Sequence, residues 1–472
     1  PCMLFMNGQP WGLYEIREKA DEHFAESNYG DNNNDVDLLN AWTVLSGSDT
    51  GWWNMYSGLF ALDPTSDAFY DFFDGYMDIE NYIDYYIGQI YYQNVDFGGY
   101  YWGANNMKVW RNRNGGKWRF IMYDMDGAMG YFGSSPYDNY IDLTRSPGSP
   151  SSYSQIFDRV MDNQDIREYF VNRFADLINT IYQPDNMESV LYAMRDSILG
   201  EIPHQVERWG APNVSTVNAY VADVLSYNNL RKNAARTHIN TSFALDGQRS
   251  LTLEVSPAGA GYIKLNTIVP TDLPWTGIYF DGVPVTMTAV ANPGYTFSNW
   301  AINDLLPAGS TDISLLINLS ESETFTAVFN GAAVMPDIVV TEINYNSHTD
   351  YPSDDWLELY NNSGIALDIS YWILRDRYDV NTFVLPAGSI MNPGERLVIA
   401  KDPVAFSAVH PGVDAVVGGF AFELDNSGDD IRLFSIDEEL ILSMTYADSS
   451  SWPEGADGNG RTLELSGLAA IL

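Results

Sequence analysis

Residues 156–239 carry apolar side chains at intervals of three or four positions, the spacing of one buried helix face. Pro184 interrupts this periodicity, and an apolar pattern begins again shortly after it. Asp185 or Asn186 is suited to cap the following helix, because short polar side chains accept hydrogen bonds from a first turn. The pattern predicts four helices, over Ile156–Ile181, Met187–Leu199, Glu201–Arg208 and Val217–Ile239.

From Leu251 onward the period changes to two, because apolar and polar residues alternate as they do along a half-buried strand. Turn residues follow at Pro257–Gly259, Gly282–Pro284 and Pro293–Gly294. After Pro336 a second β-rich block shows turn signals at short, regular intervals, which is typical of a sandwich. Its predicted strands include Ile338–Ile343, Trp356–Tyr360, Arg396–Ala400, Asp430–Phe434 and Leu440–Thr445.

These changes of pattern divide the chain into three predicted domains. Residues 1–245 mix strand and helix patterns and predict an α+β domain, residues 250–331 predict a small β-rich domain, and residues 336–468 predict a β-sandwich. A length of 472 residues fits this number, since one domain usually takes roughly 150. The fold class is therefore multidomain, with α+β followed by two β-rich domains.

The composition excludes several classes of protein. The formal net charge is −39, and such a surface repels nucleic acid because phosphate binding needs clustered Lys and Arg. The single cysteine, Cys2, rules out an internal disulfide. No apolar run is long enough for a membrane span. The chain opens inside a strand-like run at Met3–Met6, so we expect a piece of a longer protein, with any signal or sorting segment outside it.

The most informative stretch for chemistry lies between residues 93 and 130. Asn114–Gly116 is a hairpin turn between two strand-like segments, Met107–Arg111 and Trp118–Tyr123. Asp124 and Asp126 follow the second strand, and residues two apart point to the same side. Oxygen ligands at that spacing suit a hard cation such as Mg²⁺. For an isolated pair of this kind, a solvated turn is the favoured alternative.

This stretch resembles the CotH (spore coat protein H) kinase family. The family pattern is a helix end, an Asp, an Asn-rich loop, a strand ending in Trp-Arg, a Gly turn and a second strand leading into Asp-x-Asp. Further segments are similar to the same family and extend the resemblance over residues 1 to about 240. They are Asn7–Tyr14 with Glu18, Asp78–Tyr85, Phe157–Phe174 and Arg208–Trp209.

The resemblance implies a reduced protein-kinase fold that uses ATP with Mg²⁺ or Mn²⁺. Asp96 matches the acid that accepts the proton of an attacking hydroxyl. Asn106 or its neighbour Asn105 helps to hold metal, Asp124 binds the ion that bridges the nucleotide phosphates, and Asp126 supports it. Residues 99–103 form an apparent insertion that lengthens the spacing between the acid and the Asn-rich loop.

A cation must also meet the phosphates, and three residues are candidates. Lys19, Lys108 and Arg111 lie nearest in the sequence, and surface charge pairing is the alternative for each. A lesser motif runs from Asp31 to Asp37, where alternating acids are similar to a Ca²⁺ loop. The Gly expected at its sixth position is absent, so a capped helix start is favoured there over calcium.

The two later domains also resemble known families. Residues 250–331 are similar to the internalin B-repeat, which implies a β-grasp-like spacer or adhesion unit. Residues 336–468 resemble the lamin-tail domain, which implies an immunoglobulin-like sandwich used for binding or anchoring. In the latter, Glu342 and Glu358 lie near predicted strands, where hydrogen-bonded framework acids are favoured over a metal site.

Three hypotheses for function follow. The first is an exported kinase, secreted or at the cell surface, that transfers the γ-phosphoryl of ATP to Ser or Thr hydroxyls of a protein substrate. The second is a non-catalytic adhesion, matrix or coat-assembly protein with a degenerate kinase fold and a cell-surface or matrix protein as partner. The third is a carbohydrate-binding protein that displays an exposed stack of Trp52, Trp53 and Trp102. The oligomeric state stays open.

Overall fold

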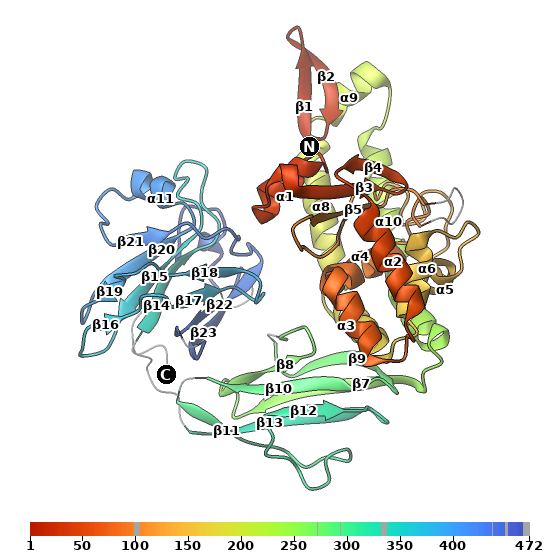
Figure 1. The fold of residues 1–472 in the computed structure, drawn as a ribbon. Coiled ribbons are helices and arrows are strands. Elements are labelled where there is room, and N and C mark those ends of the chain that lie inside the picture. Colours follow the sequence, from red (N-terminus) through yellow and green to blue (C-terminus); the bar gives the residue numbers. More distant parts are fainter. Residues whose placement is uncertain are drawn as a thin grey trace. The chain divides into compact units, whose positions relative to one another are not determined.

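The computed structural model describes residues 1–98, 104–270, 272–292, 294–331, 338–436, 438–448 and 452–465. Contacts between residues divide the chain into two compact units. The first unit comprises residues 1–251 with 277–285 and 316–322, and the second comprises 252–276, 286–315 and 323–472. The predicted middle region therefore contributes strands to both units (Figure 1).

The first unit begins with a hairpin and a four-stranded antiparallel sheet in the order β4-β3-β5-β6. One face of this sheet packs on helix α1, where Trp110 and Ile121 join a small apolar cluster (Figure 1). The other face packs on α2 and α4, where Phe120 contacts Trp52 and Tyr85. The elements are β1 (Cys2–Met6), β2 (Gln9–Tyr14), α1 (Glu22–Tyr29), η1 (Asn33–Asp35), β3 (Val36–Asn40), β4 (Thr43–Ser46), α2 (Thr50–Ala61), α3 (Asp67–Tyr76), α4 (Ile79–Tyr92), β5 (Lys108–Asn112) and β6 (Arg119–Ile121).

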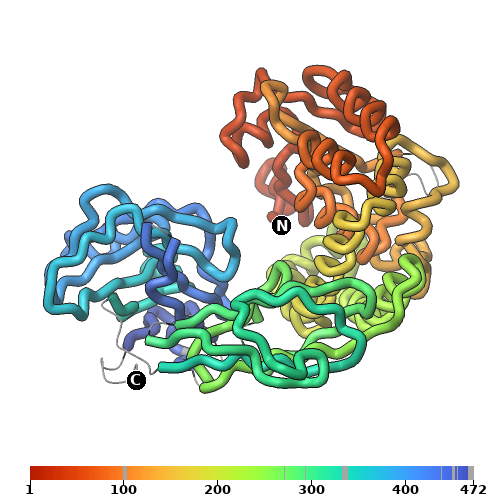
Figure 2. Tube along the Cα trace, turned by 60° about the horizontal axis from the view of Figure 1, so that its bottom comes forward, coloured from red at the N-terminus to blue at the C-terminus, as the bar shows by residue number. Residues whose placement is uncertain are grey.

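The rest of this unit is helical, as the periodicity predicts, and its course can be followed in Figure 2. The predicted helix Ile156–Ile181 is in fact two helices, because the Asn163 side chain accepts a hydrogen bond from the Ile166 N–H and caps a new helix. The next helix begins at Pro184 rather than Met187, since proline is well tolerated at a first helical position. The helices are α5 (Tyr140–Arg145), α6 (Ser152–Val160), α7 (Gln164–Asn179), α8 (Pro184–Leu199), α9 (Ile202–Trp209) and α10 (Val214–Ser242).

The middle region forms two antiparallel sheets, β12-β10-β8 and β11-β13-β7-β9. Alternate residues of these strands are buried, among them Leu251, Leu253 and Ile263, as the period of two predicts. The described part of 247–331 contains strands without a helix, so the β-grasp topology is not confirmed. The strands are β7 (Gly247–Ser256), β8 (Gly261–Leu265), β9 (Trp275–Asp281), β10 (Val285–Ala291), β11 (Tyr295–Trp300), β12 (Ser314–Ile317) and β13 (Glu323–Gly331).

The C-terminal region is an immunoglobulin-like β-sandwich. Its main sheets have the orders β21-β20-β15-β14-β24 and β18-β17-β22-β23, and one apolar core lies between them, including Leu357, Ile399 and Leu433. The elements are β14 (Ile338–Asn344), β15 (Trp356–Asn361), β16 (Leu367–Asp368), β17 (Ile373–Arg375), β18 (Thr382–Val384), β19 (Ile390–Met391), β20 (Arg396–Ala400), α11 (Pro403–Val409), β21 (Val416–Gly418), β22 (Gly428–Phe434), β23 (Leu440–Ala447), η2 (Glu454–Ala456) and β24 (Leu463–Glu464).

Candidate functional site

Helix α4 delivers the first acid of the site. The helix ends at Tyr92, and Gln93 turns the chain with a left-handed φ of 55°. Asp96 follows on a short loop whose end is anchored by Phe97, a buried ring that packs against Tyr85 and Tyr86. The loop is therefore fixed on both sides, while the Asp96 side chain stays partly open to solvent.

Two amide side chains hold the Asp96 carboxylate. Asn105 Nδ2 donates to one carboxylate oxygen at 2.8 Å, and Asn106 Nδ2 donates to the other at 3.0 Å. Asn106 is buried with a left-handed φ of 51°, and its carbonyl accepts a hydrogen bond from the Tyr85 hydroxyl at 3.3 Å. The structure thus places Asn105 and Asn106 directly beside Asp96. The apparent insertion 99–103 lies outside the described residues.

The β5–β6 hairpin delivers the second pair of acids. Asp124 follows β6 in a left-handed conformation with φ of 55°, and Asp126 is exposed beside it. Burial raises the pKa of Asp124, and the negative charges of Asp126 and Asp96 raise it further, while the positive charge of Arg17 opposes the rise. Asp124 therefore lies within electrostatic reach of both other acids, an excess of negative charge that a divalent cation would offset.

The acids form an open site rather than a closed cage. Among the His, Cys, Asp and Glu side chains that the structure describes, only Asp354, Asp355 and Glu423 bring three ligand atoms within 4.8 Å of one another. The Asp96–Asp124–Asp126 group is wider than this. Mg²⁺ usually binds to one or two carboxylates and completes its shell with waters and substrate phosphates. Asp124 with an Asn amide oxygen fits that donor chemistry.

Of the three candidate cations, Lys108 is the one whose pKa is influenced by the charge of Asp124. Its ammonium donates to the Ala20 carbonyl at 3.0 Å and lies 4.6 Å from the Tyr123 ring centroid. Burial lowers the pKa of Lys108, and the negative charges of Asp21 and Asp124 oppose this lowering. Lys19 instead pairs with Asp21 at 3.0 Å and is largely exposed.

Arg111 lies on the opposite face of the sheet from Lys108. The two residues are three apart on β5, and side chains alternate along a strand. Arg111 donates through Nε and Nη2 to the buried Asp37 carboxylate, and its guanidinium lies over the Trp118 ring. Arg113 pairs with the same carboxylate at 3.0 Å. Arg111 thus makes the charge pairing that was the alternative considered for it, with a buried carboxylate as partner.

Sequence reasoning missed three residues around the site. Arg17 lies in the polar segment between β2 and α1, and its charge reaches Asp124. Tyr123 donates to the Asn40 side chain at 2.9 Å, and burial together with Asp124 and Asp96 raises its pKa to about 12. Asn94 is buried and contacts both acidic loops. Arg17 and Asn94 stand in no periodic pattern or motif that singles them out.

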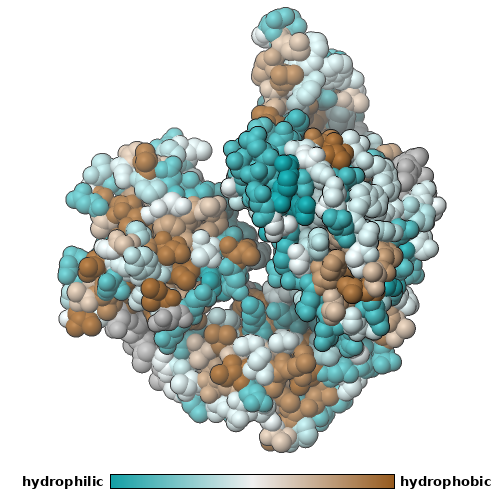
Figure 3. Space-filling model, viewed as in Figure 1, coloured by the Kyte–Doolittle hydropathy of each residue, from teal (hydrophilic) through white to brown (hydrophobic). Residues whose placement is uncertain are grey.

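Helix α1 covers the Lys108 face of the sheet. Its inner side packs Ala25 against the apolar cluster, and its outer side is hydrophilic, with Glu26 and Asn28 exposed (Figure 3). The outer side of α1 is thus polar.

The calcium loop considered at residues 31–37 has another use. Asn32 caps the short helix η1 by accepting a hydrogen bond from the Asn34 N–H, as the alternative prediction of a capped helix start has it. Asp31 accepts a hydrogen bond from Asn112, and Asp37 is bound by two arginines. These contacts favour the capped helix start, which was the preferred interpretation of this motif, over a calcium loop.

The carbohydrate hypothesis fails on the geometry of its tryptophans. Trp52 is buried, donates to Ser152 and packs edge-on against Trp118, so it cannot offer a ring face to a sugar. Trp53 is partly exposed, and Trp102 lies outside the described residues. An exposed stack that includes Trp52 is therefore ruled out.

Acids of the C-terminal sandwich serve mainly as framework. Glu358 accepts hydrogen bonds from Thr341 and pairs with Arg396, and Glu342 accepts from Thr462, as predicted for framework acids. Burial raises the pKa of Glu342.

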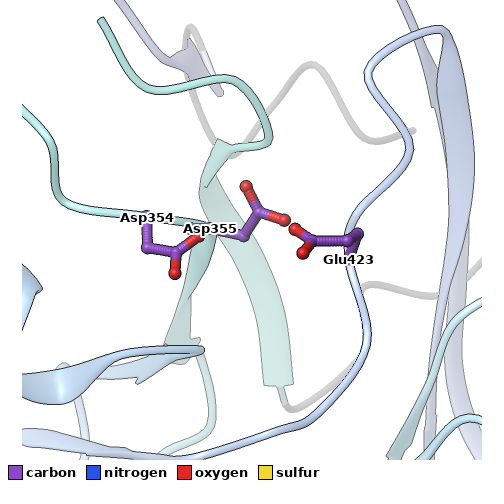
Figure 4. Close-up of side chains that lie close together, drawn as sticks. All are labelled: Asp354, Asp355 and Glu423. Carbon is purple, nitrogen blue, oxygen red and sulfur yellow. Dashed lines mark hydrogen bonds between the residues drawn. The ribbon is translucent and has the colours of Figure 1, made fainter. Parts of the chain in front are cut away.

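Asp354, Asp355 and Glu423 meet at one end of the sandwich (Figure 4). Lys401 pairs with Asp354 and Glu423 and supplies their counter-charge. The Lys401 ammonium thus already neutralises part of the negative charge of these three acids.

The fold and the site together define a class: a multidomain protein with an acid-lined site between an α4 loop and a β-hairpin, followed by β-rich domains. Comparison with known families then names its parts. A family model described as CotH kinase protein matches residues 1–235, and one described as Lamin Tail Domain matches residues 332–448. The chain therefore carries a CotH kinase domain over residues 1–235 and a lamin tail domain over residues 332–448.

The other comparisons add little. None of the curated proteins matches the chain. A solved structure of a DUF4876 family protein from Bacteroides thetaiotaomicron is 13% identical, with a TM-score of 0.17. The match covers 40% of this chain and 66% of the solved chain, so this chain spans just under two thirds of that protein's length. At that TM-score it carries no argument about fold or function. Among the described residues, no helix has the length and apolar character needed to cross a membrane.

Proposed function

We propose that the CotH kinase domain transfers the γ-phosphoryl group of ATP to a Ser or Thr hydroxyl of a protein. The observation that carries this proposal is that the Asp96 carboxylate, held by Asn105 and Asn106, lies within electrostatic reach of Asp124 on a separate loop. The match of residues 1–235 to the CotH kinase model supports ATP as the substrate and a divalent metal as the cofactor. Phosphoryl transfer depends mainly on positioning and on neutralising charge, which such a constellation supplies.

Each group then has a distinct role. Asp96 accepts the proton of the acceptor hydroxyl, whose oxygen forms the new bond to the γ-phosphorus. The bond from this phosphorus to the β–γ bridging oxygen breaks, and ADP leaves with the electron pair. Asp124 and Asn106 would hold Mg²⁺, which neutralises phosphate charge when bound, and Asp126 adds negative charge beside them. The Lys108 ammonium supplies a positive charge that offsets the negative charge of the phosphates.

The setting of the domain is also part of the proposal. We place the protein outside the cell or at its surface, with residues 250–331 as an internalin B-repeat-like spacer and the lamin tail domain as a binding module. A surface with a net charge of −39 stays solvated and suits such an exposed location.

The test is Mg²⁺-dependent transfer of labelled γ-phosphate to protein, comparing the wild type with Asp124→Asn. This change keeps the shape of the side chain and removes a charged metal ligand, so transfer should fall roughly 100-fold or more. Asp71→Asn, an exposed acid on α3, is the matched control and should leave the rate unchanged. Absence of transfer in all three proteins, despite a broad panel of acceptors, would favour the non-catalytic surface or matrix role.

A further inference from the structure

Asn94 is a buried amide that contacts both acidic loops at once. Its Nδ2 donates to the Asp124 carbonyl at 3.3 Å and to the Gln89 side chain at 3.0 Å. Its Oδ1 accepts the backbone N–H of Asp96 at 3.2 Å. A single side chain therefore connects the backbone of the proposed proton acceptor to that of the proposed metal ligand.

The surroundings hold this amide in one orientation. Gln89 is buried on α4, accepts from Asn94 and donates to the Met122 sulfur at 3.4 Å, so it also reaches the strand that leads to Asp124. Asn94 cannot swap its amide oxygen and nitrogen without placing its donor against the Asp96 N–H. The hydrogen bond from Asn94 to the Asp124 carbonyl also stabilises the left-handed backbone conformation of Asp124, which residues other than glycine rarely adopt.

Backbone contacts bring the two loops together beside Asn94. The Val95 N–H donates to the Gly127 carbonyl at 3.2 Å, and the Met129 N–H donates to the Tyr92 carbonyl at 2.8 Å. A Cβ at Gly127 would lie 2.8 Å from Asn94 Oδ1, which is too close for an undisturbed side chain. The glycine after Asp-x-Asp thus leaves room for the amide.

We infer that Asn94 is a positioning residue that fixes the separation between Asp96 and Asp124. This inference rests on the proposed function, because it assigns Asn94 a role in that same site. Without the amide, the backbone contacts between the loops remain, but the one side chain that contacts the backbone of both Asp96 and Asp124 is lost. The two acids would then no longer be held in register for one nucleotide.

The experiment uses the full chain and compares Asn94→Ala, Gly127→Ala and Asn228→Ala with the wild type. Asn228 is a buried Asn that accepts a hydrogen bond from the Tyr91 hydroxyl away from the acids, so it controls for the loss of a buried amide. Transfer is measured as kcat and as the Mg²⁺ concentration for half-maximal rate, and thermal unfolding reports the fold.

Asn94→Ala should lower kcat about 10- to 100-fold and raise the half-saturating Mg²⁺ concentration, as changes next to metal ligands do. The KM for ATP should move much less. Gly127→Ala should act in the same direction because it displaces the Asn94 oxygen, and it gives a second route if Asn94→Ala does not fold. Asn228→Ala should keep the wild-type kcat and Mg²⁺ dependence.

The outcomes separate this inference from the proposed function. An active wild type with unchanged kcat and Mg²⁺ dependence in folded Asn94→Ala or Gly127→Ala would overturn the positioning role alone. So would equal losses in the Asn94 and Asn228 variants, since these would report stability only. A wild type that neither binds Mg²⁺–ATP nor transfers phosphate would overturn the proposed function, and the positioning role with it.

Discussion

At the residue scale, strand alternation decides which cation belongs to the site. Lys108 and Trp110 point toward α1, whereas Arg111 points toward α2 and the buried Asp37. Lys108 and Arg111 are three apart on β5, so alternation along the strand puts them on opposite faces. Which face carries the acids depends on tertiary packing, so the sequence alone leaves both candidates open.

Lys108→Met and Arg111→Met should therefore have different effects. Lys108→Met keeps most of the aliphatic stem and should weaken ATP binding and transfer without lowering the free energy of unfolding. Arg111→Met removes two hydrogen bonds from the buried Asp37 and should lower that free energy by about 1–3 kcal/mol. Urea unfolding and ATP titration of both variants test the pair. Weaker ATP binding by stable Arg111→Met, with normal binding by Lys108→Met, would reverse the assignment.

Some of the site was predictable from sequence and some was not. The local hairpin turn places Asp124 at the end of a strand, and the resemblance to the CotH kinase family groups it with Asp96, Asn105 and Asn106. Arg17 reaches the site from a polar segment without periodicity. Such contacts depend on how α1 packs on the sheet, which residue spacing does not encode.

At the element scale, a loop that leads into a strand holds a carboxyl group with a strongly raised pKa. Asp355, just before β15, is buried, accepts the Leu424 N–H at 2.8 Å and lies close to Glu423. Burial raises the pKa of Asp355 to about 7, and the nearby negative charges add to this rise. The Lys401 ammonium, by contrast, lowers the pKa of Glu423.

This shift predicts a pH-dependent stability of the lamin tail domain. The folded state binds a proton that the unfolded state releases near pH 4, so the free energy of unfolding falls as pH rises from about 4 to about 7 and then levels off. Asp355→Asn should flatten this fall by an amount on the order of 1 kcal/mol. Hydrogen exchange of peptides containing Leu424, measured in the full chain across this range, provides the readout.

Asp414→Asn is the matched control, since Asp414 is exposed in the same domain. Its pH profile should follow the wild type. An Asp355→Asn profile as steep as that of the wild type would show that this carboxyl does not titrate in the predicted range.

At the scale of the whole molecule, the order of domains is predictable and their boundaries are less so. Period-two patterns separate the β-rich regions from the helical one without any tertiary information. Contacts nevertheless assign residues 277–285 to the first unit. Asn179 exchanges hydrogen bonds with the Ile278 backbone at 2.9 and 3.0 Å, and Tyr279 donates to Asp176 at 2.6 Å. Such pairings join residues about 100 positions apart, which local pattern does not reveal.

Asn179→Ala should loosen strand β9 from the helical part of its unit. The change removes both backbone contacts to Ile278 and the acceptor of the Arg236 guanidinium, so the free energy of unfolding should fall by about 1–3 kcal/mol. Faster hydrogen exchange in 275–281 should accompany it. Asn186→Ala, at an exposed position, should cost less than about 0.5 kcal/mol. Equal effects of the two changes would contradict this account.

The most direct test of the shared acid site is Mn²⁺ binding in the presence of a non-hydrolysable ATP analogue, followed by electron paramagnetic resonance. The wild type should bind one Mn²⁺–nucleotide complex. Asp124→Asn should lose most of that binding, while Asp96→Asn should retain it and lose phosphoryl transfer. Equal Mn²⁺–nucleotide binding by the wild type and Asp124→Asn would contradict the claim that these loops form one nucleotide site.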